Sequence, residues 1–326
     1  MAHPGPTAVT IGTFDGVHAG HAALVGRCRE RAGPDGRIVA LVFDPHPAAG
    51  LPGREPPGRL TTFERRRSLL LASGADEVHR LPPDKRLLAL TPGAFLRLVC
   101  TDFAPAAVVE GDDFRFGRGR AGTPEGLRSL GAELGFTVDI VAPVEVELVD
   151  QSVVRASSTT VRWLLEQGRV TDAARVLGRP YRITGSVSRG DRLGRTIGFP
   201  TANIATELVL PTDGVYAALA HLPDGRAVPA AVNVGVRPTV NGLERRFEAH
   251  LLGLSTSVGG AWAAIEGVPE YGWPIGVDLI AWVRDQMRFP SIDALRAQLV
   301  RDCDRIPGLL ASAGTLSETN LQGTTS

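Results

Sequence analysis

The sequence predicts an α/β domain with a parallel sheet, followed by a small antiparallel β-barrel with a C-terminal helix. In the first half, apolar strand-like runs alternate with helix-like segments, which favours a parallel sheet covered on both faces. The pattern changes near Leu177–Pro180, and the β-rich runs beyond it are separated by Gly and Pro. We therefore expect one domain over residues 1–180, a second over 181–308, and a disordered tail over 309–326.

The elements of the first domain follow from apolar runs and capping residues. Thr61 and Glu64 fit a capping box that opens a helix, and Gly74 is placed to end it. Thr-Pro pairs, an N-cap followed by Pro, open two more helices at Thr91 and Thr123. A further helix is expected over about His21–Arg31. The expected strands are Ala8–Ile11, Ile38–Phe43, Ala107–Glu110 and Phe136–Val141.

The second domain is expected to consist of strands closed by one helix. Leu295, Leu299 and Cys303 recur at i, i+4 and i+8 and predict a helix over Ser291–Ile306. The expected strands are Tyr181–Val187, Gly214–His221, Ala227–Val234, Arg245–Leu252 and Gly276–Val283.

Composition excludes several classes of protein. Lys plus Arg and Asp plus Glu are equal at 35 each, so a broad nucleic-acid surface is not expected. The cysteines Cys28, Cys100 and Cys303 are too scattered for a disulfide framework or a cysteine zinc site. No apolar run reaches the ~18 residues of a membrane-spanning helix, and the N-terminus lacks a signal core. We expect a cytoplasmic protein that binds neither nucleic acid nor membrane.

The turn after the first strand carries the motif His18-Ala19-Gly20-His21. Ligands of parallel α/β sheets bind beyond the carboxyl ends of the strands, where this turn lies. A helix N-terminus favours anions, and two imidazoles there can hydrogen-bond triphosphate oxygens as negative charge develops. The motif therefore predicts nucleotidyl transfer, with His18 and His21 catalytic and the substrate's own phosphate attacking. The alternative, that they are surface or cap histidines, is disfavoured by the strand and glycines around them.

This segment resembles the HxGH nucleotidyltransferases, and most closely the FAD synthetase module of prokaryotic bifunctional riboflavin kinase/FAD synthetases. Three further segments, Phe43–Pro47, Gly111–Gly117 and Ser157–Arg162, occur in the family's order. The resemblance implies a Rossmann-like sheet. It also implies ATP or phosphate contacts at Gly12, Phe14, Asp15, Gly20, Ser157, Ser158, Thr159 and Arg162, and FMN contacts at Asp44, Asp113, Phe114 and Arg115.

Each of these segments also has a purely structural interpretation. Phe114 and Phe116 could pack on an aromatic ring of the substrate or form a pair in the core. The hydroxyls of residues 157–160, with Arg162, could hold pyrophosphate. Ser158 or Thr159 could instead cap a helix. The aspartates could belong to turns, and the choice stays open for each segment taken alone.

The run Gly185–Asn203 resembles the riboflavin kinase module. Its Gly-rich part can fold over phosphates, and Thr201 and Asn203 offer neutral oxygens suited to Mg²⁺. The resemblance implies metal contacts at Thr201 and Asn203 and a catalytic base at Glu248, which shares a strand face with His250. A solvated strand Glu is the alternative. The implied ATP-binding residues are Gly185, Gly190, Gly194, Gly198, Pro200, Thr201 and Asn203.

One stretch departs from the family's pattern. Residues 253–270, before Tyr271-Gly272, are longer than the short turn usual there. Long loops are often functional. The stretch could be a tolerated insertion, an altered lid, or a defect that weakens the kinase.

The resemblance implies that ATP phosphorylates riboflavin to FMN in the barrel, and that a second ATP adenylylates FMN to FAD and pyrophosphate in the first domain. ATP, riboflavin, FMN and Mg²⁺ are the expected partners, and a homo-oligomer is left open. The alternatives are an FAD synthetase with an impaired kinase, a nucleotidyltransferase for another phosphorylated metabolite, and a non-enzymatic flavin-binding protein. An aminoacyl-tRNA synthetase is disfavoured by neutral charge and the absence of a Lys-Met-Ser-Lys-Ser motif.

Overall fold

The computed structural model describes residues 5–314 except 52, 191–193, 195–196, 240–241 and 255–268, and describes only the backbone at 237–239 and 242–244. The chain forms two compact units, one of residues 1–147 with 151–160 and the other of residues 148–150 with 161–326. The predicted order, a parallel sheet with helices followed by an antiparallel barrel, is confirmed.

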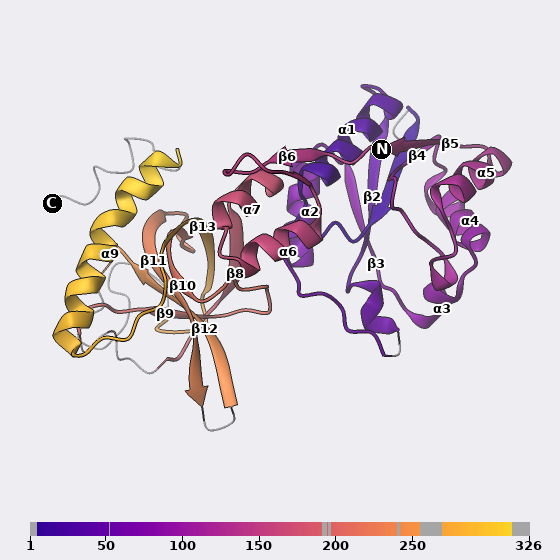
Figure 1. Ribbon diagram of the computed structural model, residues 1–326. Coiled ribbons are helices and arrows are strands. Elements are labelled where there is room, and N and C mark those ends of the chain that lie inside the picture. Colours follow the sequence, from indigo (N-terminus) through magenta and orange to yellow (C-terminus); the bar gives the residue numbers. More distant parts are fainter. Residues whose placement is uncertain are drawn as a thin grey trace. The chain divides into compact units, whose positions relative to one another are not determined.

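The first unit is a five-stranded parallel sheet of order β3-β2-β1-β4-β5 (Figure 1). Its strands are β1 Thr7–Gly12, β2 Arg37–Phe43, β3 Glu77–Leu81, β4 Ala107–Gly111 and β5 Thr137–Val141. Its helices are α1 Ala19–Ala32, α2 Phe63–Ala72, α3 Lys85–Ala89, α4 Pro92–Phe103 and α5 Pro124–Leu134, with short 3₁₀ turns η1 Pro47–Gly50 and η2 Arg118–Arg120. A two-stranded ribbon adds β6 Glu145–Glu147 and β7 Val153–Arg155.

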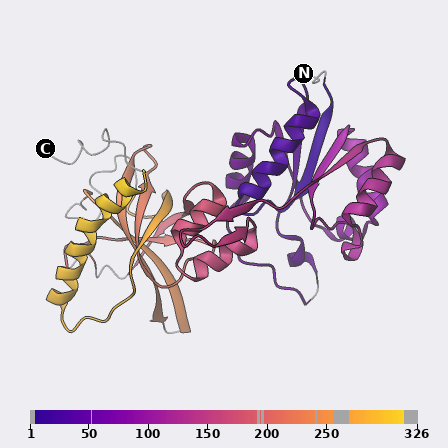
Figure 2. The same cartoon turned by 45° about the horizontal axis from the view of Figure 1, so that its top comes forward.

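The sheet has a core on each face, as expected when parallel strands are apolar on both sides. On one face, Val25 of α1 and Leu70 of α2 pack on Ala8 and Ala40. On the other face, the side chains of α4 and α5 cover Val9, Ile11 and their neighbours. Figure 2 shows the two pairs of helices on opposite sides of the strands.

The Thr-Pro helix starts are confirmed, whereas the predicted capping box at Thr61 is wrong. Thr91 and Thr123 accept hydrogen bonds from the backbone N–H three residues on, at 3.3 and 3.2 Å. In α2 the cap is Thr62, which accepts from Arg65 N at 3.2 Å. The Thr61 hydroxyl is instead engaged by the turn that follows β1.

The second unit is a closed barrel of order β10-β11-β12-β9-β8-β13. Its strands are β8 Tyr181–Ser188, β9 Ala202–Ala205, β10 Gly214–His221, β11 Ala227–Thr239, β12 Gly242–Leu251 and β13 Pro274–Arg284. Its helices are α6 Ser158–Glu166, which starts in the first unit, α7 Val170–Leu177 and α9 Ile292–Ser312.

The final helix is longer than predicted. It was expected to end at Ile306, but it continues to Ser312, because Leu310 is fully buried and packs with Ile306 against Val215 and Val283 of the barrel. Figure 2 shows α9 running beside the strands. The tail prediction is therefore wrong for residues 309–312, and residues 315–326 lie outside the described part of the chain.

The compact units divide at residue 160, before the boundary expected after residue 180. Thr212 N donates to the carbonyl of Leu165 in α6 at 2.9 Å, and the Thr171 hydroxyl of α7 donates to Ile280 O at 3.1 Å. These bonds pack α6 and α7 with the barrel. All three cysteines are free. None of the helices described is long and apolar enough to cross a membrane.

Candidate active sites

The turn between β1 and α1 has an uncommon backbone. Phe14, Gly16 and Val17 have positive φ, at 49°, 85° and 44°. Glycine adopts such angles freely, whereas Phe and Val do so at a cost. Phe14 and Val17 are 1% and 4% exposed and pack in the core with Val25 of α1. The side chain of Phe14, expected to contact ATP, therefore anchors the turn in the core.

The two histidines of the motif lie together at the start of α1. Their rings stack with centroids 3.6 Å apart, and the backbone N–H of His18 donates to Nδ1 of His21 at 3.3 Å. Since Nδ1 of His21 accepts, neutral His21 carries its proton on Nε2 and can donate it. A Cβ at Gly20 would lie 3.1 Å from the ring of His18, so glycine leaves room for that ring. The arrangement places hydrogen-bond donors at a helix N-terminus, where anions bind.

Asp15 fastens this turn to the chain before α2. Its carboxylate accepts from Leu60 N at 3.0 Å, and from the N–H and hydroxyl of Thr61 at 3.0 Å each. The Thr61 hydroxyl in turn accepts from Gly16 N at 3.0 Å. The carbonyl of Asp15 accepts from the Ser158 hydroxyl at 2.7 Å, which brings the predicted phosphate loop to the motif. The described contacts of Asp15 therefore hold the motif turn against the chain before α2 and against the start of α6.

The predicted phosphate loop forms the start of α6. The Ser157 hydroxyl accepts from Thr160 N at 3.0 Å, so Ser157 caps the helix and the proposed caps Ser158 and Thr159 are wrong. The Thr160 hydroxyl donates to Arg155 O at 2.8 Å. Arg162 lies on α6, one turn beyond Ser158. Hydrogen bonds within the protein thus already use three of the four hydroxyls expected to hold pyrophosphate, those of Ser157, Ser158 and Thr160.

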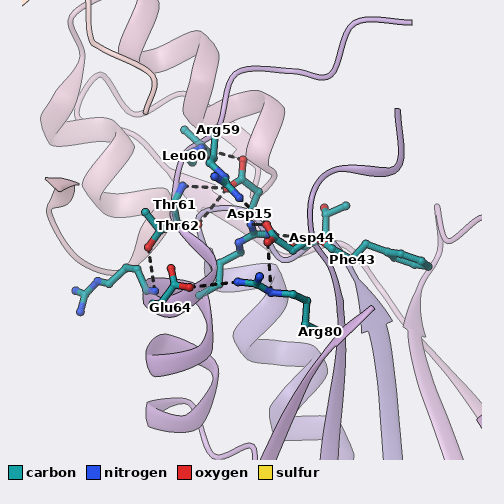
Figure 3. Close-up of polar contacts among 12 residues, drawn as sticks. Asp15, Phe43, Asp44, Arg59, Leu60, Thr61, Thr62, Glu64 and Arg80 are labelled. Carbon is teal, nitrogen blue, oxygen red and sulfur yellow. Dashed lines mark hydrogen bonds and ion pairs between the residues drawn. The ribbon is translucent and has the colours of Figure 1, made fainter. Parts of the chain in front are cut away.

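Asp44, at the end of β2, is surrounded by arginines (Figure 3). It is 6% exposed and accepts hydrogen bonds from Arg66 and from Arg59, the latter at 2.7 Å. Nε of Arg80 lies 3.5 Å from its other oxygen. Arg66 also donates to the carbonyl of Thr13 at 2.8 Å, and burial lowers the pKa of its guanidinium. Asp44, expected to contact the flavin, is therefore the centre of an ion-pair cluster that supports the motif turn.

The segment after β4 divides into buried and exposed residues. Phe116 is 5% exposed and stacks on Phe114 at 5.2 Å, so the core interpretation holds for Phe116. The carboxylate of Asp113 is 3.4 Å from Arg155 and its side chain is 77% exposed. Arg115 donates to the Phe114 carbonyl at 2.7 Å. Asp113 and Arg115 are thus accessible to a ligand beyond the carboxyl end of β4.

On the barrel, a row of polar residues crosses three neighbouring strands. Asn203 of β9 pairs in register with Glu248 of β12, which pairs with Asn233 of β11. Paired residues of adjacent strands project from the same face. The flanking residues Phe247 and Ala249 are buried on the opposite face. Glu248, expected as the base, therefore stands between two amides on the outer side of the barrel.

His250, two residues beyond Glu248, holds the Pro-Thr-Ala-Asn turn. Its Nδ1–H donates to the carbonyl of Pro200 at 2.8 Å, and its ring meets Phe199 edge-on at 5.3 Å. Burial lowers the pKa of His250 below its ordinary value, which keeps the ring neutral at pH 7. Thr201 and Asn203 are therefore tied to the strand that carries Glu248.

Three of the predicted glycines are needed for close approach. A Cβ at Gly190 would lie 2.0 Å from the amide nitrogen of Asn203, and one at Gly194 would lie 2.2 Å from the carbonyl of Phe199. A Cβ at Gly185, on β8, would lie 2.2 Å from the carbonyl oxygen of Ala205, and Gly198 lies in the turn before Phe199. Residues 191–193 and 195–196 of the Gly-rich run lie outside the described residues. Over the described chain, no His, Cys, Asp and Glu side chains form a group of three that could hold a metal.

Comparison with known proteins identifies the family of each domain. A model of the FAD synthetase family matches residues 1–157, and one of the riboflavin kinase family matches residues 177–310. The bifunctional riboflavin kinase/FMN adenylyltransferase of Escherichia coli strain K12 is 36% identical over 90% of each chain. The chain belongs to the bifunctional riboflavin kinase/FMN adenylyltransferase family.

Other members of this family show the same extent of similarity. Those of Haemophilus influenzae and Pseudomonas fluorescens are 33% and 35% identical, each covering about nine tenths of both chains. A crystal structure described as a macrolide-efflux protein from Streptococcus pneumoniae has the same fold, with a TM-score of 0.80, 28% identity and coverage of 94% of this chain and 95% of that chain. As a bifunctional transferase, the chain carries both domains that the family's name implies.

Sequence reasoning missed several residues of these two family sites. Arg66, which joins Asp44 to the motif turn, lies on the buried side of α2, four residues before Leu70. A charged residue at a core position of an amphipathic helix was the signal available. Asn233, in register with Glu248, accepts from the amide of Gln286 at 3.1 Å. No local pattern pairs these two residues, because they are 53 positions apart along the chain.

Proposed function

We propose that this chain adenylylates FMN at the β1–α1 turn, with His18 and His21 as the catalytic residues. A phosphate oxygen of FMN attacks the α-phosphorus of ATP, the bond to the α–β bridging oxygen breaks, and pyrophosphate leaves. The observation that carries this proposal is the stacked histidine pair at the N-terminus of α1, with a donor on Nε2 of His21. Such donors stabilise the charge that develops in the transition state.

In the same proposal, FMN and ATP contact the residues that the family resemblance implies. Ser158 supports this, because its hydroxyl donates to the motif turn, and Gly20 supports it, because the His18 ring packs closely against it. Asp113 and Arg115 support it, because both are exposed in the segment after β4, where a ligand can reach them. Asp15, Asp44 and Phe14 contribute by holding the turn, since their side chains are buried.

For the barrel, the proposed reaction is phosphorylation of riboflavin. The primary hydroxyl of riboflavin loses its proton to Glu248 and attacks the γ-phosphorus of ATP, the bond to the β–γ bridging oxygen breaks, and ADP leaves. The cross-strand row of Asn203, Glu248 and Asn233 supports this assignment, because it puts the base beside the turn proposed to bind ATP. Positioning and charge stabilisation account for most catalysis of phosphoryl transfer.

Thr201 and Asn203 are the proposed contacts of Mg²⁺. Their side chains supply neutral oxygens, the donor type that suits a hard cation bound mainly through ATP phosphates. Mg²⁺ bound there would neutralise charge on those phosphates. The chain's own part is to fix both residues beside Glu248 through the bond between His250 and Pro200.

A cytoplasmic location is also proposed, because all three cysteines are free thiols and ATP is the phosphate donor. Assembly into a homo-oligomer stays a prediction.

The deciding experiment is an assay of the purified chain with riboflavin, ATP and Mg²⁺, with products separated by chromatography. FMN followed by FAD is expected. FAD from supplied FMN without any FMN from riboflavin would favour the synthetase with an impaired kinase. Flavin binding without turnover would favour the non-enzymatic alternative.

A further inference from the structure

The pairing between β1 and β4 stops before either strand ends. β1 pairs with β2 from Thr7 to Gly12, but with β4 only Ala8 and Val9 are paired. The same register continued would bring Ile11 opposite Glu110. There the backbone N–H of Ile11 donates to the carboxyl of Glu110 at 2.6 Å. A side chain thus takes the place of the main-chain acceptor that a continuing ladder would supply.

This position is the point where the strand order of the sheet reverses. In the order β3-β2-β1-β4-β5, the crevice between β1 and β4 separates the two halves. Ligands of open α/β sheets bind at such a switch point. From β1 the chain enters the turn that carries His18 and His21, and from β4 it enters the segment that carries Asp113. Glu110 therefore lies where both of these segments of the first site leave the sheet.

Burial of this carboxyl is costly. Glu110 is 2% exposed, and across the described residues no Arg, Lys or His side chain is paired with it. Burial raises the pKa of Glu110 well above its ordinary value of 4.5; the bond from Ile11 opposes this shift, and the charge of Asp113 adds to it. The charge of Glu110 in turn raises the pKa of Cys28 of α1, after the larger effect of that thiol's own burial. An apolar residue at position 110 would avoid the free-energy cost of burying a carboxyl group. Proteins keep such a cost mainly at sites that serve function.

We propose that Glu110 is a positioning residue for adenylyl transfer. Its carboxyl holds the N–H of Ile11 and ends the β1–β4 ladder, which fixes the point where β1 separates from β4, one residue before Gly12. The places of the His18 and His21 rings follow from that point. The inference rests on the proposed first-site function, and it adds to that function a residue outside the motif.

The test compares Glu110→Gln with Glu110→Met in the full-length protein. Gln keeps an oxygen that accepts from Ile11, whereas Met matches the length of Glu without that oxygen. Small misplacements of catalytic groups reduce rates by up to about 100-fold. We therefore expect kcat for FMN adenylylation to fall by about 10- to 100-fold in Glu110→Met and to stay within about twofold in Glu110→Gln. Glu133→Met, at an exposed site on α5, is the matched control.

Two further measurements separate positioning from simple damage. Riboflavin phosphorylation should be unchanged in every variant, and the melting temperature of Glu110→Met should not fall below that of wild type. Because the folded-state pKa of Glu110 lies above 4.5, the wild type should lose stability relative to Glu110→Gln as pH rises from 4.5 towards that pKa. If Glu110→Met does not fold, Glu110→Leu takes its place.

Unchanged adenylylation in Glu110→Met would overturn the inference, as would an equal loss in Glu110→Gln. If the wild type makes FAD and His21→Ala does not, the proposed function stands, and either of these Glu110 results overturns this inference alone. If the wild type makes no FAD from FMN, the proposed function fails and this inference fails with it.

Discussion

Asp15→Asn tests whether the contacts beneath the H-x-G-H motif control its chemistry. One oxygen of the Asp15 carboxylate accepts from the N–H and hydroxyl of Thr61, and the N–H of Leu60 is shared between both oxygens, at 3.1 and 3.0 Å. An Asn there keeps one oxygen and turns its NH₂ group towards one of these donors. With the oxygen kept towards Thr61, the NH₂ group would face the N–H of Leu60, donor against donor, and Leu60 is fully buried.

The expected loss of stability follows from these contacts. A hydrogen bond to a charged group contributes about 1.5–3 kcal/mol, and a buried donor left unpaired costs about 1–3 kcal/mol. These costs overlap, so about 2–4 kcal/mol is expected for the first unit. For a unit of this size, 1 kcal/mol shifts the melting temperature by about 2–4 °C. The shift should therefore be roughly 4–16 °C.

Fluorescence distinguishes the two units in this measurement. All four tryptophans, Trp163, Trp262, Trp273 and Trp282, follow residue 160 and so belong to the second unit. Circular dichroism at 222 nm reports on both units. In Asp15→Asn, the dichroism transition of the first unit should move to lower temperature while the tryptophan transition stays in place. Adenylylation should fall and riboflavin phosphorylation should persist.

The control is Asp35→Asn, at an exposed position of the same unit, which should change neither quantity. The reasoning is refuted if Asp15→Asn melts within about 1 °C of wild type, or if it is destabilised and yet adenylylates FMN at the wild-type rate at 20 °C.

Three further changes probe the remaining groups. His21→Ala should lower FMN adenylylation by at least about 100-fold, because a donor to developing charge is lost, and should spare the kinase in the same sample. Glu248→Gln should lower riboflavin phosphorylation by about 100- to 10,000-fold without affecting conversion of FMN to FAD. Although burial of Asp278 opposes its ionisation, hydrogen bonds from Arg182 and His221 hold its pKa below 3.8. The barrel should thus lose stability as pH falls through and below 3.8, and Asp278→Asn should flatten this dependence in tryptophan-monitored unfolding.

Each of these expectations has a contrary outcome. Normal FAD formation by His21→Ala would remove the histidine pair from the mechanism. Kinase turnover that survives Glu248→Gln would require another base or none. An acid unfolding midpoint unchanged by Asp278→Asn would mean that its ion pairs contribute no net stability.

Elements with strong local signals were predictable from the sequence. The strand before the H-x-G-H motif, the helix after it and the Thr-Pro helix starts follow from short-range rules of burial and capping. β3 was missed, because Glu77–Leu81 alternates charged and apolar residues too briefly to stand out. β9 was missed as a strand because its four residues belong to a motif that was interpreted by its chemistry.

The interior of the first site was not predictable in the same way. The family resemblance points to Phe14 and Asp44. It does not show that Phe14 is buried in the core or that Asp44 lies among arginines. Those partners, Arg59, Arg66 and Arg80, are brought to Asp44 by the fold, and no local periodicity specifies them. The choice of Thr62 over Thr61 as cap likewise depends on Asp15, 46 positions before Thr61.

The long segment before Tyr271 leaves and rejoins the barrel at fixed points. Leu252 N donates to Pro229 O at 2.9 Å on one side, and Gly272 N donates to Val187 O at 2.7 Å on the other. With both ends bonded to neighbouring strands, the register of the barrel does not depend on how many residues lie between them. Closing a loop of twice the length costs only about 0.6 kcal/mol more. We therefore expect the register of the barrel to withstand a change in the length of this segment, most of which, residues 255–268, lies outside the described residues.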